Sequence, residues 1–403
     1  MMKRILAALL ILTAALSCKR EAPRATEPFL ITFRMPEECM TSVKYKNRRV
    51  YFNGNLSYQF VTDAAGKATV EDLVPGIYDI VTNWEMSGAD YKALLKDSDI
   101  PLKDNAQVIV GVSLMGQRLF TPEDMEVDLS AAVVQGLMIS KVYYSGTKDD
   151  LDKTYTTDSY IEIFNNSDEV IYIDGWYLGL TESVSPAAYP AKDDPEHVYL
   201  RQVCQFPGNG ATYPVQPGGQ IVVATKSARD HTQSAKKSVD LSGADFEVKV
   251  SEGSGNPDVP MMPIVYNSLK IQYMNLLSGG PNGVVLFETE EDINTWPKVY
   301  QPGLTSGEMF LVVDKEVISD GVECLKKPAQ TDPDVNTKRL QKEIDAGYIN
   351  INAVNGYNHE SVERKVTREN DGRYYLKDTN NSSVDLAVCT DPTPRKYDKE
   401  GLL

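Results

Sequence analysis

The most informative part of the chain is residues 136–178, GLMISKVYYSGTKDDLDKTYTTDSYIEIFNNSDEVIYIDGWYL. Residues 160–164 (YIEIF) alternate, which places Ile161 and Ile163 on one face of a predicted strand. After an Asn-rich break, residues 170–173 form a second β-branched and aromatic run. We expect the two runs to pair as a hairpin, because Asn tolerates the backbone conformations of tight turns.

The length and composition indicate a multidomain globular protein. At about 100–200 residues per domain, 403 residues suggest two or three domains. A hydrophobic content of 42% is ordinary for a chain that buries a core. The formal net charge of -16 opposes nucleic-acid binding, because that affinity comes from Lys and Arg neutralising phosphates. We therefore expect no nucleic-acid partner.

The N-terminus has the pattern of an exported protein. Lys3 and Arg4 precede the apolar stretch 5–16, which fits a secretory h-region of roughly 7–15 residues. A helix that crosses a bilayer needs about 20 apolar residues, so this stretch is too short to be a transmembrane segment. We expect residues 1–17 to be a signal peptide.

The next residues resemble a bacterial lipobox in relaxed form, Ala15-Leu16-Ser17-Cys18. The resemblance implies that Cys18 is the lipid-attachment site and that residues 18–27 form the acylated tether. Each buried CH₂ of an acyl chain contributes about 0.8 kcal/mol, so several chains would hold the protein on the outer membrane. The alternative is a secreted protein without this anchor. In related bacteria, acidic residues directly after the Cys mark surface export. Here the basic residues Lys19 and Arg20 come before Glu21, which departs from that pattern, so the periplasmic face and the cell surface both stay open.

Residues 28–133 are predicted to form the first folded domain. Residues 62–80, TDAAGKATVEDLVPGIYDI, resemble the carboxypeptidase-regulatory, or prealbumin-like, β-sandwich. The resemblance implies a non-catalytic spacer or docking module with Tyr78 in its core. Strands are expected at 29–34, 49–52, 58–61, 108–114 and 125–129.

Residues 134–389 are predicted to form the second domain. The stretch quoted first, with YPVQPGGQIVVA at 213–224, resembles the lamin-tail-like domain, an immunoglobulin-type β-sandwich. The whole chain resembles the DUF4876 family of Bacteroidetes-type lipoproteins of unknown function. The predicted fold class is therefore mainly β, with two immunoglobulin-like or prealbumin-like sandwiches.

A long insertion, about 226–356, elaborates the second predicted sandwich, and residues 390–403 form a C-terminal tail. Within the insertion we expect strands at 269–273, 283–287 and 308–313 and a helix at 336–346, where Leu340 and Ile344 have helical spacing. Closing strands are expected at 361–365 and 372–381.

The sequence contains few signals of catalysis. None of the three histidines, His197, His231 and His359, has a metal-ligand spacing. No nucleophile elbow or phosphate-binding loop is present. We therefore expect no enzyme activity, no cofactor and no metal. Trp176 and Trp296 are expected to be core residues; an exposed aromatic strip would instead favour glycan binding.

Two acidic loops leave calcium as an alternative to a solvated surface, because Ca²⁺ prefers several oxygen ligands. One contains Asp149, Asp150, Asp152 and Asp158; the other contains Asp332, Asp334, Asn336 and Glu343 but lacks the Gly that a calcium loop requires. Four cysteines besides Cys18 allow either two disulfides or free buried thiols. They are Cys39, Cys204, Cys324 and Cys389.

These features together predict a cell-envelope lipoprotein that acts as a non-enzymatic binding or docking module at the outer membrane. The expected partner is an outer-membrane protein, for instance a transporter that it assists, or a polysaccharide. The alternatives are a structural or adhesive surface protein and, with less support, a hydrolase or nuclease-associated protein with its site in the insertion.

Overall fold

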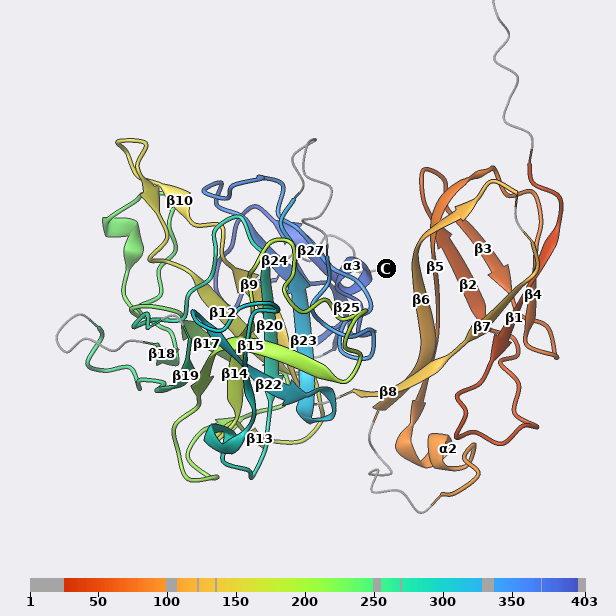
Figure 1. The fold of residues 1–403 in the computed structure, drawn as a ribbon, viewed down its shortest axis with the longest axis horizontal. Coiled ribbons are helices and arrows are strands. Elements are labelled where there is room, and N and C mark those ends of the chain that lie inside the picture. Colours follow the sequence, from red (N-terminus) through yellow and green to blue (C-terminus); the bar gives the residue numbers. More distant parts are fainter. Residues whose placement is uncertain are drawn as a thin grey trace, which may run out of the picture. The chain divides into compact units, whose positions relative to one another are not determined.

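The computed structural model describes residues 25–98, 107–121, 123–134, 136–248, 255–268, 270–327, 337–370 and 372–397. The fold is mainly β, as predicted (Figure 1). The chain divides into two compact units, of which the first holds most residues up to Ala131 and the second most residues from Ala132 onward.

The first unit contains a three-stranded and a five-stranded sheet. The three-stranded sheet has the order β4 (Lys67–Val70), β1 (Phe29–Arg34), β7 (Met125–Asp128). The five-stranded sheet has the order β3 (Tyr58–Val61), β2 (Arg49–Asn53), β5 (Gly76–Ser87), β6 (Gln107–Leu119), β8 (Ser130–Val134). A short helix, α2 (Gly88–Lys92), follows β5.

Alternation of side chains builds the core of this unit. Val50 and Phe52 of β2 are fully buried, whereas Tyr51 between them is exposed. Successive side chains of a strand point to opposite faces, so one face of the sheet is covered and the other is not. Phe52 packs against Tyr78 with ring centroids 6.2 Å apart. The prediction that Tyr78 is a core residue is confirmed.

The second unit contains two larger sheets. The first, six-stranded, has the order β18 (Phe246–Glu247), β17 (Gln220–Ala224), β12 (Tyr160–Asn165), β9 (Leu137–Tyr143), β24 (Ser361–Arg364), β27 (Leu386–Cys389). The second is seven-stranded, with the order β21 (Lys298–Tyr300), β22 (Met309–Asp314), β15 (His197–Gln205), β14 (Tyr177–Thr181), β20 (Asn282–Phe287), β23 (Ile318–Cys324); its seventh strand, β19 (Ile264–Asn267), pairs with β15.

Short elements complete the second unit. Three two-stranded ladders are β10 (Thr147–Lys148) with β11 (Thr154–Tyr155), β13 (Ile171–Tyr172) with β16 (Pro214–Val215), and β25 (Val366–Asn370) with β26 (Arg373–Leu376). The short helices are η1 (His231–Gln233), η2 (Ile293–Thr295), η3 (Lys315–Val317) and α3 (Ser382–Asp385).

The two large sheets enclose one hydrophobic core. Ile161 and Ile163 of β12 lie in the same buried cluster as Trp176, Leu178 of β14 and Val284 of β20. The predicted inward face of residues 160–164 and the core position of Trp176 are therefore confirmed. Strands β19 to β23 all come from residues 226–356, so this segment supplies most of the seven-stranded sheet.

The predicted hairpin between residues 160–164 and 170–173 is wrong. Strand β12 pairs on one side with β9 and on the other with β17, and β13 pairs with β16 instead. The side-chain amide of Asn165 donates to the carbonyls of Glu169 and Val215 at 2.7 and 2.8 Å. These bonds turn the chain away from β12, whose two edges are already paired.

Two further local predictions are wrong. Residues 270–273 are not a strand, and residues 337–346 are turns rather than a helix, although Leu340 and Ile344 are buried. The Glu323 carboxylate accepts the backbone N–H groups of Arg339 and Leu340, at 3.0 and 2.7 Å. The first N–H groups of a helix have no intrahelical partner. Here the Glu323 side chain satisfies such N–H groups although no helix follows.

The cysteines follow the free-thiol alternative. Cys204, Cys324 and Cys389 are free, which excludes every disulfide among the four candidates. Burial raises the pKa of the Cys204 thiol well above its ordinary value, so this thiol is unreactive.

Candidate functional site

Several predicted site residues lie outside the described part of the chain. Cys18 and the signal peptide are among them, as are Asp332, Asp334 and Asn336 of the second acidic loop. Glu343, the remaining residue of that loop, is exposed. None of the helices in the described ranges is long and apolar enough to cross a membrane.

The acidic residues of the first loop do not converge. Asp150 pairs with Lys236 at 3.2 Å, and Asp152 pairs with Lys148 at 2.8 Å. Asp149 accepts backbone N–H groups of its own turn at 2.9 Å. Among the described residues, no group of three His, Cys, Asp or Glu side chains is placed to hold a metal ion.

Asp158, the fourth residue of this loop, is buried just before β12. The Tyr143 hydroxyl donates a hydrogen bond to Asp158 Oδ2 at 2.9 Å. Burial raises the pKa of Asp158 to about 6, even though the hydrogen bond from Tyr143 favours the ionised form. Burial and the charge of Asp158 both raise the pKa of Tyr143. The two groups form an interior pair that takes up a proton at mildly acidic pH.

The three histidines have separate surroundings. His197 Nδ1 lies 3.1 Å from the Asp194 carboxylate. His231 Nδ1 lies 2.8 Å from the Tyr155 hydroxyl, and burial lowers the pKa of His231. His359 packs edge-on against the Tyr143 ring, and burial lowers its pKa as well.

Trp176 and Trp296 both belong to packed layers and not to an exposed aromatic strip. Trp176 is in the core between the sheets. Trp296 stacks on Phe287 with ring centroids 6.2 Å apart, and its indole N–H donates to Glu291 at 2.6 Å. Phe287 in turn stacks on Tyr177 at 5.0 Å. Trp296 therefore packs against the hydrophobic cluster on the outer face of the seven-stranded sheet.

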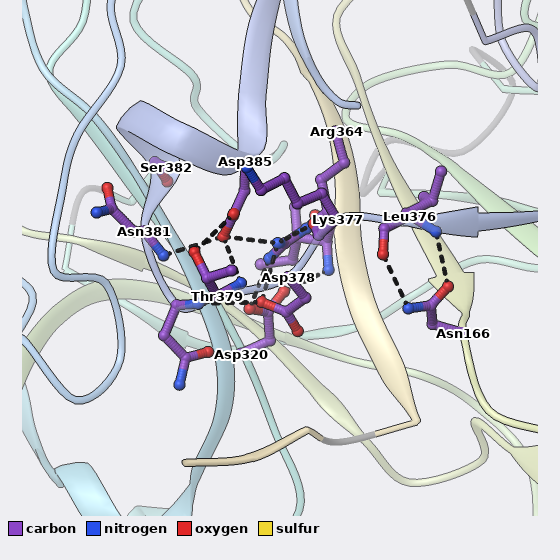
Figure 2. A network of polar contacts seen from close by, with 12 residues as sticks. Asn166, Asp320, Arg364, Leu376, Lys377, Asp378, Thr379, Asn381, Ser382 and Asp385 are labelled. Atoms are coloured by element: carbon purple, nitrogen blue, oxygen red, sulfur yellow. Dashed lines mark hydrogen bonds and ion pairs between the residues drawn. The ribbon is translucent and has the colours of Figure 1, made fainter. Parts of the chain in front are cut away.

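A buried arginine at the centre of the second unit was not singled out from the sequence. Arg364 of β24 contacts Asp320 of β23 at 2.9 Å and Asp378 at 3.0 Å, and Asp385 of α3 lies 3.6 Å away (Figure 2). Its Nε–H also donates to the carbonyl of Ile139 in β9 at 2.8 Å. Since β23 and β24 belong to different sheets, this ion pair joins the two layers of the sandwich.

Burial and charge compete within this network. Burial lowers the pKa of Arg364, but the carboxylates of Asp378, Asp320 and Asp385 outweigh it and raise that pKa above its ordinary value. Burial raises the pKa of Asp320 to about 7 and that of Asp385 to about 6. One cation thus faces three acidic groups, two of which bind protons near neutral pH. The Arg364 side chain is only 2% exposed, so the network serves packing.

An exposed apolar row lies on the five-stranded sheet of the first unit. Arg49 pairs with Val61 and Tyr51 with Val81, so the side chains of Val61, Tyr51 and Ile77 all point away from the core. They are 54%, 38% and 51% exposed. We call Val61, Tyr51 and Ile77 the apolar row. The run RVYFN in β2 contained the signal for it, because apolar residues occupy both faces of that strand.

The second unit is thus a sandwich tied across its layers by the buried Arg364–Asp320 ion pair, and the first unit presents an apolar row to solvent. One comparison matches part of the chain to a family. Residues 216–393 match the sequence model of the family described as protein of unknown function (DUF4876). The predicted resemblance to that family is confirmed over this part of the chain.

A solved structure supports the same fold. The crystal structure of a DUF4876 family protein from Bacteroides thetaiotaomicron VPI-5482 aligns with 89% of this chain and 94% of its own, at 20% identity and a TM-score of 0.55. No curated protein matches the chain. The resemblance of residues 28–133 to the carboxypeptidase-regulatory fold stays a prediction.

Proposed function

We propose that this protein is a cell-envelope lipoprotein, anchored through Cys18 at the outer membrane, that docks a protein partner without catalysing a reaction. The observation that carries the docking role is the apolar row. Its three apolar side chains lie on β3, β2 and β5, and each exposes more than a third of its surface. Exposed apolar patches of this kind mark interaction sites.

The non-enzymatic part of the proposal rests on how the ionisable residues are used. The carboxylates around Arg364 and the acidic residues of the first loop, Asp150 and Asp152, have partners within the protein. Such groups are held by structural contacts rather than presented to a substrate. An outer-membrane protein, for example a transporter, is the partner that an anchored docking module would meet.

The anchor is tested by fractionation. A Cys18→Ala variant should lose membrane association, because it cannot be acylated, whereas a Cys389→Ala variant should remain in the membrane fraction. Sedimentation of Cys18→Ala with the outer membrane would contradict the anchor.

The docking face is tested by crosslinking in cells. A photoreactive amino acid at position 51 of the full chain should yield one dominant membrane-protein adduct. The control places the same group at Lys67, an exposed residue of β4 in the other sheet of this unit. Equal adduct patterns from the two positions would show that the apolar row is not the docking face.

A further inference from the structure

The outer face of the six-stranded sheet carries buried charges that the packing of the two sheets does not use. Glu162 lies between Ile161 and Ile163 on β12, so it points away from the shared core, yet it is fully buried. Lys141 of β9 lies opposite Glu162 and forms a 3.0 Å ion pair with Glu363 of β24. The side chains of Lys141 and Glu363 are 0% and 7% exposed. A face with such groups must be covered by a polar partner.

The partner is the C-terminal segment, residues 392–397. Lys141 Nζ donates to the carbonyls of Thr393 and Lys396, at 3.0 and 2.6 Å. Glu162 accepts the backbone N–H of Arg395 at 2.7 Å. Tyr160 lies two residues before Glu162 and on the same outer face of β12. Its hydroxyl donates to the carbonyl of Pro392 at 2.8 Å. The sheet therefore recognises this segment largely through its main chain.

Two side chains anchor the segment. Pro392 and Tyr397 are buried, whereas Arg395 and Lys396 between them are exposed. The Tyr397 hydroxyl donates to Glu162 at 2.5 Å, and Lys141 Nζ lies 4.8 Å from the centre of its ring. At the outer edge, the Arg395 guanidinium contacts the Asp245 carboxylate at 2.5 Å, which adds a charged contact.

This arrangement has the form of a ligand in a groove. If the segment left, Glu162 would lose the donors from Arg395 and Tyr397, and Lys141 would lose two carbonyls. Departure of the segment would expose these groups to water, and a peptide that offers the same donors and acceptors would restore the contacts. The segment is joined to β27, which ends at Cys389, only through the exposed residues Thr390 and Asp391.

We propose that the outer face of β12, β9 and β24 is a peptide-binding groove, that residues 392–397 are its ligand within one chain, and that the same segment of a second copy can take its place. The ligand class is a short peptide with a buried Pro and Tyr separated by four residues and an Arg two before the Tyr. Exchange between two copies reproduces every contact described above, and exchanging an identical element between protomers is a low-cost route to a dimer.

The first test uses the complete chain with a protease site inserted between Thr390 and Asp391, cleaved after folding. A fluorescent peptide of residues 391–403 should bind the cleaved protein saturably, as measured by anisotropy. A Tyr397→Ala peptide should bind at least about tenfold more weakly, because it loses a bond to a buried carboxylate and its ring contacts. A Lys396→Ala peptide is the matched control and should bind almost as well, because that side chain is exposed.

Three outcomes would overturn the groove: no binding of the peptide, equal binding of the Tyr397→Ala peptide, or unfolding of the cleaved protein. The last would mean that the segment is an inseparable part of the fold. A Glu162→Gln change in the cleaved protein should weaken peptide binding while its circular dichroism stays unchanged; unaltered affinity would also contradict the proposal.

The second test concerns exchange between copies. The uncleaved chain, incubated at high concentration in mild denaturant and returned to buffer, should yield a dimer by light scattering. The dimer should be suppressed by an excess of the free peptide and by Tyr397→Ala. A chain that stays monomeric, or a dimer that the peptide does not suppress, would overturn exchange between copies.

Discussion

Among the described residues, Arg364 is the only cation of the network that joins the two sheets of the second unit. Replacing it by Met removes that charge. The side chains have similar length, so the change deletes charge and hydrogen bonds more than volume. Asp320, Asp378 and Asp385 then remain close together without a counter-charge. Breaking a buried ion pair from one side typically costs about 3–5 kcal/mol, and we expect a loss of this order.

The loss should depend on pH. Burial raises the pKa of Asp320 to about 7 and of Asp385 to about 6, above their values in the unfolded chain. Groups with a raised folded pKa favour folding most at low pH, and this contribution disappears as the pH rises through 6 to 7. Without Arg364 these carboxylates hold their protons more strongly. The destabilisation should therefore be largest at pH 8 and smaller at pH 5.

Urea unfolding followed by tryptophan fluorescence measures this effect, since Trp176 lies in the core of the same unit. The control is Lys148→Met, which breaks an exposed ion pair with Asp152 and should cost at most about 1 kcal/mol. A loss for Arg364→Met no larger than that of the control would refute the role of the network. A loss that is equal at pH 5 and pH 8 would refute its coupling to protonation.

Three further changes test the packing and the titration of the sandwich. Burial raises the pKa of Asp158 to about 6, so this carboxyl contributes to folding stability at low pH, and that contribution is lost as the pH rises through 6. The stability of Asp158→Asn relative to the wild type should therefore increase from pH 4 to pH 8; a constant difference in urea midpoint would contradict this. Ile163→Ala should cost about 2–5 kcal/mol in chemical unfolding, whereas Leu151→Ala, at an exposed position, should stay within about 0.5 kcal/mol; similar losses would argue against the shared core. Gly179→Ala places a Cβ 2.7 Å from Leu200 and should cost about 1–3 kcal/mol, and an unchanged midpoint would show that the sheet relaxes freely there.

Local pattern was sufficient to locate many strands. Residues 29–34, 220–224, 283–287 and 308–313 were predicted as strands and correspond to β1, β17, β20 and β22 within a residue or two. Alternation also placed Ile161 and Ile163 inward, because the two faces of a strand see different surroundings whichever strands lie beside it. The family resemblance likewise came from the sequence.

The pairing of strands and the burial of polar side chains could not be predicted in the same way. The chain around Asn165 looked like a hairpin turn, but both edges of β12 were taken by β9 and β17, and the second of these lies more than fifty residues downstream. Residues 337–346 have helical spacing, yet the distant Glu323 carboxylate satisfies their backbone.

The sequence alone determined the class of fold, the positions of its main strands and which apolar side chains face inward, because these depend on residues close together in the chain. Only the tertiary structure decided which strands pair and which charges are buried. Asp320, for example, accepts the N–H of Ile139, which is 181 residues away, and Lys141 meets Thr393 across 252 residues. A buried charge is stable only where the fold brings its partners close, and contacts between residues so distant in the chain cannot be predicted from the local sequence pattern.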